Sequence, residues 1–145
     1  TYTCLHYHLV FSTRHRRPDL AATWRAALHD YLGGCVRGLD GFPEGVGGVS
    51  DHVHLLVSLK ATHRLSDFMR ELKKASSAWI RETHHIRDFH WQEGYAAFSV
   101  SASVRDAVRT YIAGQEEHHR KTGFREELIV FLEKHGVPYE ERFLD

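Results

Sequence analysis

Hydrophobic and polar residues alternate in two segments of the chain, as they do in half-buried β-strands. In residues 3–12 one predicted face holds Leu5, Tyr7, Leu9 and Phe11. In residues 51–59 the matching face holds Val53, Leu55, Val57 and Leu59. The opposite face carries histidines in both segments, namely His6, His8, His52 and His54.

Apolar residues spaced by three or four positions predict helices over residues 20–39 and 65–80. A third helix is expected over residues 103–121, because Ser103 begins a capping-box pattern and Gly123 can end the helix. A short helix should follow over residues 125–134. Two more strands are expected, one over residues 95–101 and a short one in the glycine-rich stretch 40–48.

The predicted order is β-α-β-β-α-β followed by C-terminal helices. This is the order of an α+β, ferredoxin-like (RRM-like) fold, an antiparallel sheet with helices on one face. An additional C-terminal helix would carry Tyr111. Neither a linker nor an internal repeat is visible, so residues 1–145 are interpreted as one domain. The strands in 3–12 and 51–59 would be central neighbours, and their four histidines would line the open side of the sheet.

The composition directs attention to metal chemistry. Thirteen of the 145 residues are histidine, the commonest metal ligand in proteins. The two cysteines fit neither a disulfide framework nor a cysteine-based metal site, and we expect a reducing, cytoplasmic setting. No apolar run is long enough to span a membrane.

The formal net charge is zero, which argues against a protein that simply coats nucleic acid. Local basic clusters remain, and a solvated surface is the alternative interpretation of each. The candidates for contact with phosphate groups are Arg14, Arg16, Arg17, Lys73 and Lys74.

Two short motifs could carry chemistry. His52 and His54 point the same way on a strand and could bind one ion, although thirteen histidines produce roughly one His-x-His by chance. Tyr111 and Gln115 lie one helical turn apart, where an apolar stripe becomes polar. The alternative for this second pair is a half-buried tyrosine beside an exposed glutamine.

Taken together, these motifs resemble a known family. The segment Asp51-His52-Val53-His54-Leu55-Leu56-Val57, followed by Tyr111-x-x-x-Gln115, resembles the single-tyrosine HUH transposases. These are small TnpA-like insertion-sequence enzymes that act on single-stranded DNA, with the REP-associated tyrosine transposases as relatives. Further similar stretches are His8-Leu9-Val10-Phe11 leading to Arg14-x-Arg16-Arg17, Trp91-Gln92-Glu93-Gly94-Tyr95, Gln115-Glu116-Glu117-His118-His119 and Gly136-Val137-Pro138-Tyr139. The glycine-rich stretch 41–48 departs from the family, which has a more regular second strand there.

The resemblance implies a function and a site. Tyr111 would be the nucleophile that forms a 5′-phosphotyrosine, and His52, His54 and Gln115 would bind one Mg²⁺ or Mn²⁺ ion. His6, His8 and His118 would surround these ligands. The substrate would be single-stranded DNA, with hairpins at the ends of the mobile element.

The resemblance also implies a homodimer, in which the tyrosine helix crosses to the partner. The link from Val100 to Ser103 is short, so we expect the helix not to fold back over its own sheet. The active sites would then be shared between subunits.

Three other functions stay open at this point. The chain could be a domesticated HUH nickase that cuts host repeats without transposing. It could be a ferredoxin-like nucleic-acid-binding module, although such a module needs exposed aromatic residues on the sheet. It could also be a metal hydrolase in which Tyr111 is structural, and such an enzyme would form no covalent adduct with DNA.

Overall fold

The protein was analysed as a computed structural model that describes residues 1–144. The core elements are β1 (His6–Ser12), α1 (Ala22–Gly38), β2 (Phe42–Gly48), β3 (His52–Ser58), α2 (Leu65–Thr83) and β4 (Ala96–Val100). The strands form one antiparallel sheet in the order β2-β3-β1-β4. The predicted α+β, ferredoxin-like architecture is confirmed. Across the described residues, no helix is long and apolar enough to cross a membrane.

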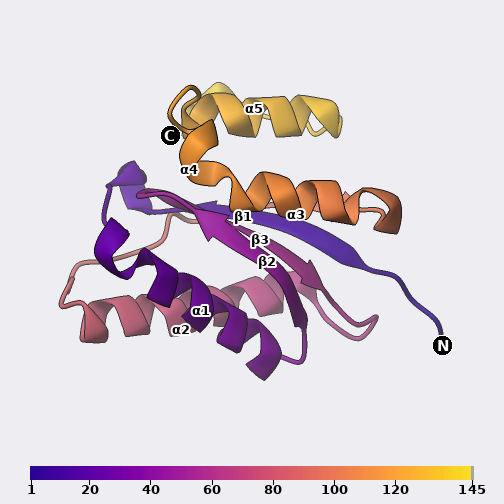
Figure 1. The fold of residues 1–145 in the computed structure, drawn as a ribbon, viewed down its shortest axis with the longest axis horizontal. Coiled ribbons are helices and arrows are strands. Elements are labelled where there is room, and N and C mark those ends of the chain that lie inside the picture. The colour runs from indigo at the N-terminus through magenta and orange to yellow at the C-terminus, as the bar shows by residue number, and fades with distance from the viewer. Residues whose placement is uncertain (145) are drawn as a thin grey trace.

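One face of the sheet packs on α1 and α2, which lie together below it in Figure 1. Alternation along β1 and β3 puts Leu9 opposite Leu55 and Phe11 opposite Val53 in this layer. All four side chains are almost completely buried. Burying a side chain of this size contributes about 1.5–3 kcal/mol, so this layer anchors the two central strands.

The second face is covered by the C-terminal helices α3 (Arg105–Ala113), α4 (Gln115–His118) and α5 (Phe124–Lys134), which lie above the sheet in Figure 1. Helix α3 packs over β2 and β3. Helix α5 packs over β1 and β4 in a separate cluster of Val10, Phe98, Phe124 and Leu132. The prediction that this face is open is therefore wrong: the C-terminal helices cover it, and its histidines lie in a buried layer.

The predicted helix over residues 103–121 is wrong as a continuous element. A 3-10 turn (Ala102–Val104) precedes α3, and Ser103 bonds to the Ser101 hydroxyl at 3.0 Å instead of capping the helix. The helix then breaks at Gly114, whose ψ of 19° departs from helical geometry. Glycine tolerates such a bend because it has no side chain. The chain then leaves the axis of α3 and rises through α4 toward α5, with Gln115 buried at the start of α4 (Figure 1).

The glycine-rich segment forms the full strand β2, and its irregular composition has a packing reason. A Cβ atom on Gly47 would lie 2.1 Å from the backbone oxygen of Ile112 in α3. Only a residue without a side chain allows the backbones of β2 and α3 to approach this closely. The glycines that distinguish residues 41–48 from the family therefore allow α3 to pack closely on the sheet.

Candidate active site on the histidine face of the sheet

The two histidines of β3 form the floor of the site. His52 and His54 are fully buried and point away from α1 and α2, with ring centroids 5.2 Å apart. From the neighbouring strand, His8 places its Nε2 atom 2.7 Å from Nδ1 of His54. Of the four histidines predicted to gather on this face, His8, His52 and His54 lie together here.

Tyr111 and Gln115 both reach this floor, from the two sides of the break at Gly114. Gln115 opens α4 and lies buried, with its Oε1 atom 3.3 Å from Nε2 of His52. Tyr111 remains on α3, with its ring centroid 5.9 Å from that of His54. The structure thus brings together Tyr111, Gln115, His52 and His54.

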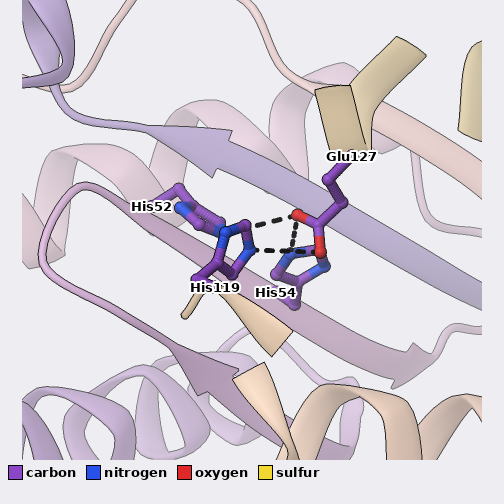
Figure 2. Close-up of side chains that lie close together, drawn as sticks. All are labelled: His52, His54, His119 and Glu127. Atoms are coloured by element: carbon purple, nitrogen blue, oxygen red, sulfur yellow. Dashed lines mark hydrogen bonds and ion pairs between the residues drawn. The ribbon is translucent and has the colours of Figure 1, made fainter. Parts of the chain in front are cut away.

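Two residues in the cluster were missed by the sequence reasoning. Glu127 of α5 is 3% exposed, and its Oε1 atom lies 2.8 Å from Nε2 of His54. His119, just after α4, lies with Nε2 3.2 Å from the other carboxylate oxygen. Figure 2 shows their side chains converging with those of His52 and His54. A signal for Glu127 existed, because helical spacing from Phe124 to Phe131 places it on the apolar face of α5.

Hydrogen bonds on the far side of each ring determine which ring nitrogen faces the cluster. Nδ1 of His52 lies 2.7 Å from the Asp51 carboxylate, so Nδ1–H donates to Asp51 and Nε2 is the ring nitrogen that faces the cluster. Nε2 would bind an ion after losing its proton. For His54, the N–H lies on Nε2 facing Glu127 when no ion is bound, so Nε2–H of His8 donates to Nδ1; with an ion on Nε2, Nδ1–H of His54 would donate to His8 instead. Partners of this kind orient metal-binding histidines in proteins.

Burial and neighbouring charges shift the pKa values in the site. Burial, with His54 close by, lowers the pKa of His8 to about 3, which keeps it neutral. Burial alone would lower the pKa of His52, but hydrogen bonds with Asp51 and Glu127 raise it. Burial opposes ionisation of Glu127, yet hydrogen bonds from His119, His52 and His54 hold its pKa well below the usual range. The carboxylate is therefore ionised at neutral pH.

The nucleophile candidate is held in its protonated form. The Tyr111 hydroxyl donates to the Glu127 carboxylate and lies 3.2 Å from Nε2 of His118. Partial burial, together with the neighbouring negative charge, raises the pKa of Tyr111. Unassisted, this tyrosine would be a poor nucleophile at neutral pH.

The donor set suits a divalent ion. One ligand atom each from His52, His54, His119 and Glu127 lies within 4.8 Å of the others, and Gln115 adds an amide oxygen beside His52. Imidazole nitrogens accept several transition metals, whereas carboxylate and carbonyl oxygens favour Mg²⁺ and Mn²⁺. The residues present therefore fit the ion that the resemblance implies.

The other two histidines predicted to surround the ligands, His118 and His6, lie in different places. His118 lies beside Tyr111, as expected. His6 does not belong to the site, because it pairs with Ser58 at the far end of β3 and its Nδ1 atom lies 3.0 Å from Glu44. The period-two alternation put His6 on the correct face but at the wrong end of the strand.

Most of the predicted phosphate-contacting residues have protein partners. The Lys73 ammonium donates to the backbone carbonyls of Gln92 and Gly94, and burial lowers its pKa to about 8. The Arg17 guanidinium bonds to Asp88 at 2.9 Å. Arg16 lies near enough to Asp51 to help lower the pKa of that carboxyl, after the larger effect of His52. Exposed positions are held by Arg14 and Lys74, and the role of all five in DNA binding stays a prediction.

The expectation that α3 cannot fold back over its own sheet is wrong. The link after β4 turns within residues 101–104, and α3 packs on β2 and β3 of the same chain. The hydrogen bonds from Tyr111 to Glu127 and from Nε2 of His52 to Gln115 Oε1 are likewise made within one chain. One copy of the protein thus assembles the whole cluster, so a shared site is not required.

A tyrosine beside buried histidines on a ferredoxin-like sheet is an arrangement suited to metal-assisted cleavage of phosphodiesters. Residues 1–115 match the family described as IS200-like transposases, and the chain belongs to that family. The resemblance identified from the motifs is thereby confirmed. The match ends before α5, which contributes Glu127.

Individual relatives agree with this assignment. The ISDra2 transposase TnpA of Deinococcus radiodurans is 28% identical over 121 residues, covering 78% of this chain and 85% of that protein. A crystal structure of a candidate transposase from D. radiodurans R1 superposes with a TM-score of 0.63 and 26% identity, over 77% of this chain and 91% of the other. A REP-associated tyrosine transposase bound to a REP hairpin shares the fold, with a TM-score of 0.57 and 17% identity over 77% and 67% of the two chains.

Proposed function

We propose that this transposase cleaves and rejoins single-stranded DNA with Tyr111 as its nucleophile and one Mg²⁺ or Mn²⁺ ion. The observation that carries the proposal is the position of the Tyr111 hydroxyl. It bonds to the same carboxylate that lies against His52 and His54. A phosphate held at the proposed ligands would therefore lie within reach of this hydroxyl.

In the proposed reaction, the Tyr111 oxygen attacks the scissile phosphorus and the bond to the 3′-oxygen of the preceding nucleotide breaks. A 5′-phosphotyrosine forms and a 3′-hydroxyl is released. The acceptors within reach of the tyrosine proton are Glu127 and Nε2 of His118. A divalent ion bound by His52, His54 and Gln115 would withdraw charge from the phosphate and fix it for in-line attack.

The second half of the cycle reverses the first. A 3′-hydroxyl attacks the phosphotyrosine, the bond to Tyr111 breaks and its oxygen is reprotonated. The energy of the phosphodiester is retained in the covalent intermediate, so rejoining needs no nucleotide cofactor. Two ends of one element need two tyrosines, and we propose a homodimer in which each copy carries its own site. Hairpin-forming DNA and a cytoplasmic location belong to the same proposal.

The test is incubation with 5′- and 3′-labelled single-stranded DNA from the flanks of the gene, plus Mn²⁺, followed by denaturing electrophoresis. A covalent protein–DNA adduct is expected with the unmodified chain and not with Tyr111→Phe. Tyr31→Phe is the matched control, because Tyr31 lies on α1 under the opposite face of the sheet. Cleavage without an adduct would instead identify a hydrolase. An adduct that forms but never rejoins a second strand would favour a nickase.

A further inference from the structure

Glu127 is an unusual residue for its position. Helix α5 packs its apolar side onto β1 and β4. Glu127 lies on that buried side and is charged, whereas its neighbours there are apolar. A buried carboxylate must be paired or bound to a metal, because desolvation of a charge costs several kcal/mol. The nearest groups are those of the active site, so the reason for this residue lies there.

The two oxygens of Glu127 contact different parts of the site. Oε1 lies 2.8 Å from Nε2 of His54 and 3.4 Å from Nε2 of His52. Oε2 accepts from the Tyr111 hydroxyl and lies 3.2 Å from Nε2 of His119. One oxygen therefore faces the proposed ligand nitrogens, and the other faces the nucleophile.

These separations fit a common ion. Ligand atoms at right angles about 2.1 Å from an octahedral ion are themselves about 3 Å apart. Nε2 of His52 faces Oε1, and because Nδ1–H donates to Asp51, Nε2 is the ring nitrogen left to bind an ion. Two imidazoles and an amide alone would leave both positive charges of a divalent ion unbalanced, and a carboxylate balances one of them.

We propose that Glu127 is a direct ligand of the ion through Oε1, beside His52 and His54. This inference rests on the proposed function. It makes α5, which lies outside the residues matched by the family, part of the metal centre (Figure 2). It also adds a carboxylate oxygen, which favours Mg²⁺ and Mn²⁺ over softer ions. Because Oε2 still faces Tyr111, the carboxylate links the ion to the nucleophile.

The test measures Mn²⁺ binding to the full chain without DNA, by calorimetry and by loss of the free-ion electron paramagnetic resonance signal. Glu127→Gln is nearly isosteric and should weaken binding at least about 10-fold. Glu127→Asp keeps the charge but withdraws the oxygen by one methylene, and it should also weaken binding. Glu126→Gln is the matched control, because this exposed neighbour loses the same charge, and it should bind Mn²⁺ as the unmodified chain does.

A second measurement does not depend on whether the variants fold. The unmodified chain is labelled with ¹³C at its glutamate carboxyl groups, and the Mn²⁺–¹³C coupling is measured by electron–nuclear double resonance. A strong coupling is expected, because Glu127 is the glutamate in the candidate metal cluster found among residues 1–144. Absence of coupling, or unchanged or tighter Mn²⁺ binding in folded Glu127→Gln, overturns the inference.

His52→Ala separates the two proposals. Loss of binding in His52→Ala but not in Glu127→Gln would leave the proposed function intact and remove Glu127 from the ligands. Mn²⁺ binding unaffected by His52→Ala would contradict the metal site of the proposed function itself.

Discussion

The Tyr111 hydroxyl donates a hydrogen bond to the carboxylate of Glu127, sixteen residues further along the chain. Two helices meet in this contact, and each covers a different half of the sheet: α3 lies over β2 and β3, and α5 over β1 and β4. The nucleophile candidate therefore reaches the buried histidines between two helices of its own chain. Its position depends on how both helices are seated.

The proposed ligand histidines should be separable from the other histidines of the same sheet face. His52→Ala and His54→Ala should each reduce DNA cleavage at least about 100-fold, beyond the 10–100-fold typical of losing an outer partner. Gln115→Ala should reduce it less, because an amide is the weakest donor of the three. Adduct formation with Mn²⁺ measures each effect.

His6→Gln is the control for this series. His6 is buried on the same face but bonds to Glu44, away from the cluster. Its replacement should leave cleavage within about two-fold of the unmodified chain. A loss as large as that of His52→Ala would mean that the histidine face acts as a whole and that the assigned ligands are wrong.

His8 should give the metal-free protein a specific sensitivity to acid. Burial lowers the pKa of His8 to about 3, whereas the unfolded chain protonates it near 6.5. Unfolding is thus accompanied by proton uptake as the pH falls from about 6.5 toward 3, and stability falls in that window. One such group contributes a slope of up to about 1.4 kcal/mol per pH unit.

The comparison for His8 is His8→Gln, whose side-chain amide can still hydrogen-bond to His54 but does not titrate. Urea unfolding without metal should show a shallower loss of stability between pH 6 and pH 4 for this variant. Identical pH profiles for the two proteins would contradict a neutral, buried His8.

Gly47 should matter for activity although it touches no substrate. In Gly47→Ala the new methyl group overlaps the backbone oxygen of Ile112, so α3 must move and Tyr111 with it. Overpacking of this kind costs about 1–3 kcal/mol, and cleavage should fall more than Mn²⁺ binding does. Gly34→Ala is the control, since nothing lies within 4 Å of that position on α1 and the change should slightly stabilise the helix. Equal behaviour of the two variants would show that α3 is not held by β2.

The sequence was most informative where a pattern repeats locally. Alternation in β1 and β3 predicted which side chains face the helices, and it put His8, His52 and His54 on the other side. Order and alternation together sufficed for the ferredoxin-like topology. The family resemblance supplied the pairing of His52 and His54 with Tyr111 and Gln115, which the spacing alone could not establish.

What the sequence did not reveal depends on contacts between distant segments. Helical spacing puts Glu127 on the apolar face of a short helix, but its partners are known only once α5 is placed on the sheet. The bend at Gly114 could not be predicted either, because it depends on the contact between Gln115 and His52, which are far apart in the sequence. The path of α3 depended on the small clearance over Gly47, and chain length between β4 and α3 gave no indication of it.

The arrangement of α3 leads to a prediction about subunits. Tyr111 and the histidines of one chain lie in one cluster, and Ile112 is buried against Leu56 of the same chain. Each copy should therefore act with its own tyrosine, even within a dimer.

The test mixes Tyr111→Phe with His52→Ala under conditions that exchange subunits, with exchange monitored by native mass spectrometry of tagged chains. In a cis arrangement every copy retains one defect, so the mixture should form no adduct. Shared sites would instead make one of the two sites in each heterodimer intact, and random exchange would restore about a quarter of the unmodified activity. Restoration to that level would show that α3 leaves its own sheet in the active dimer.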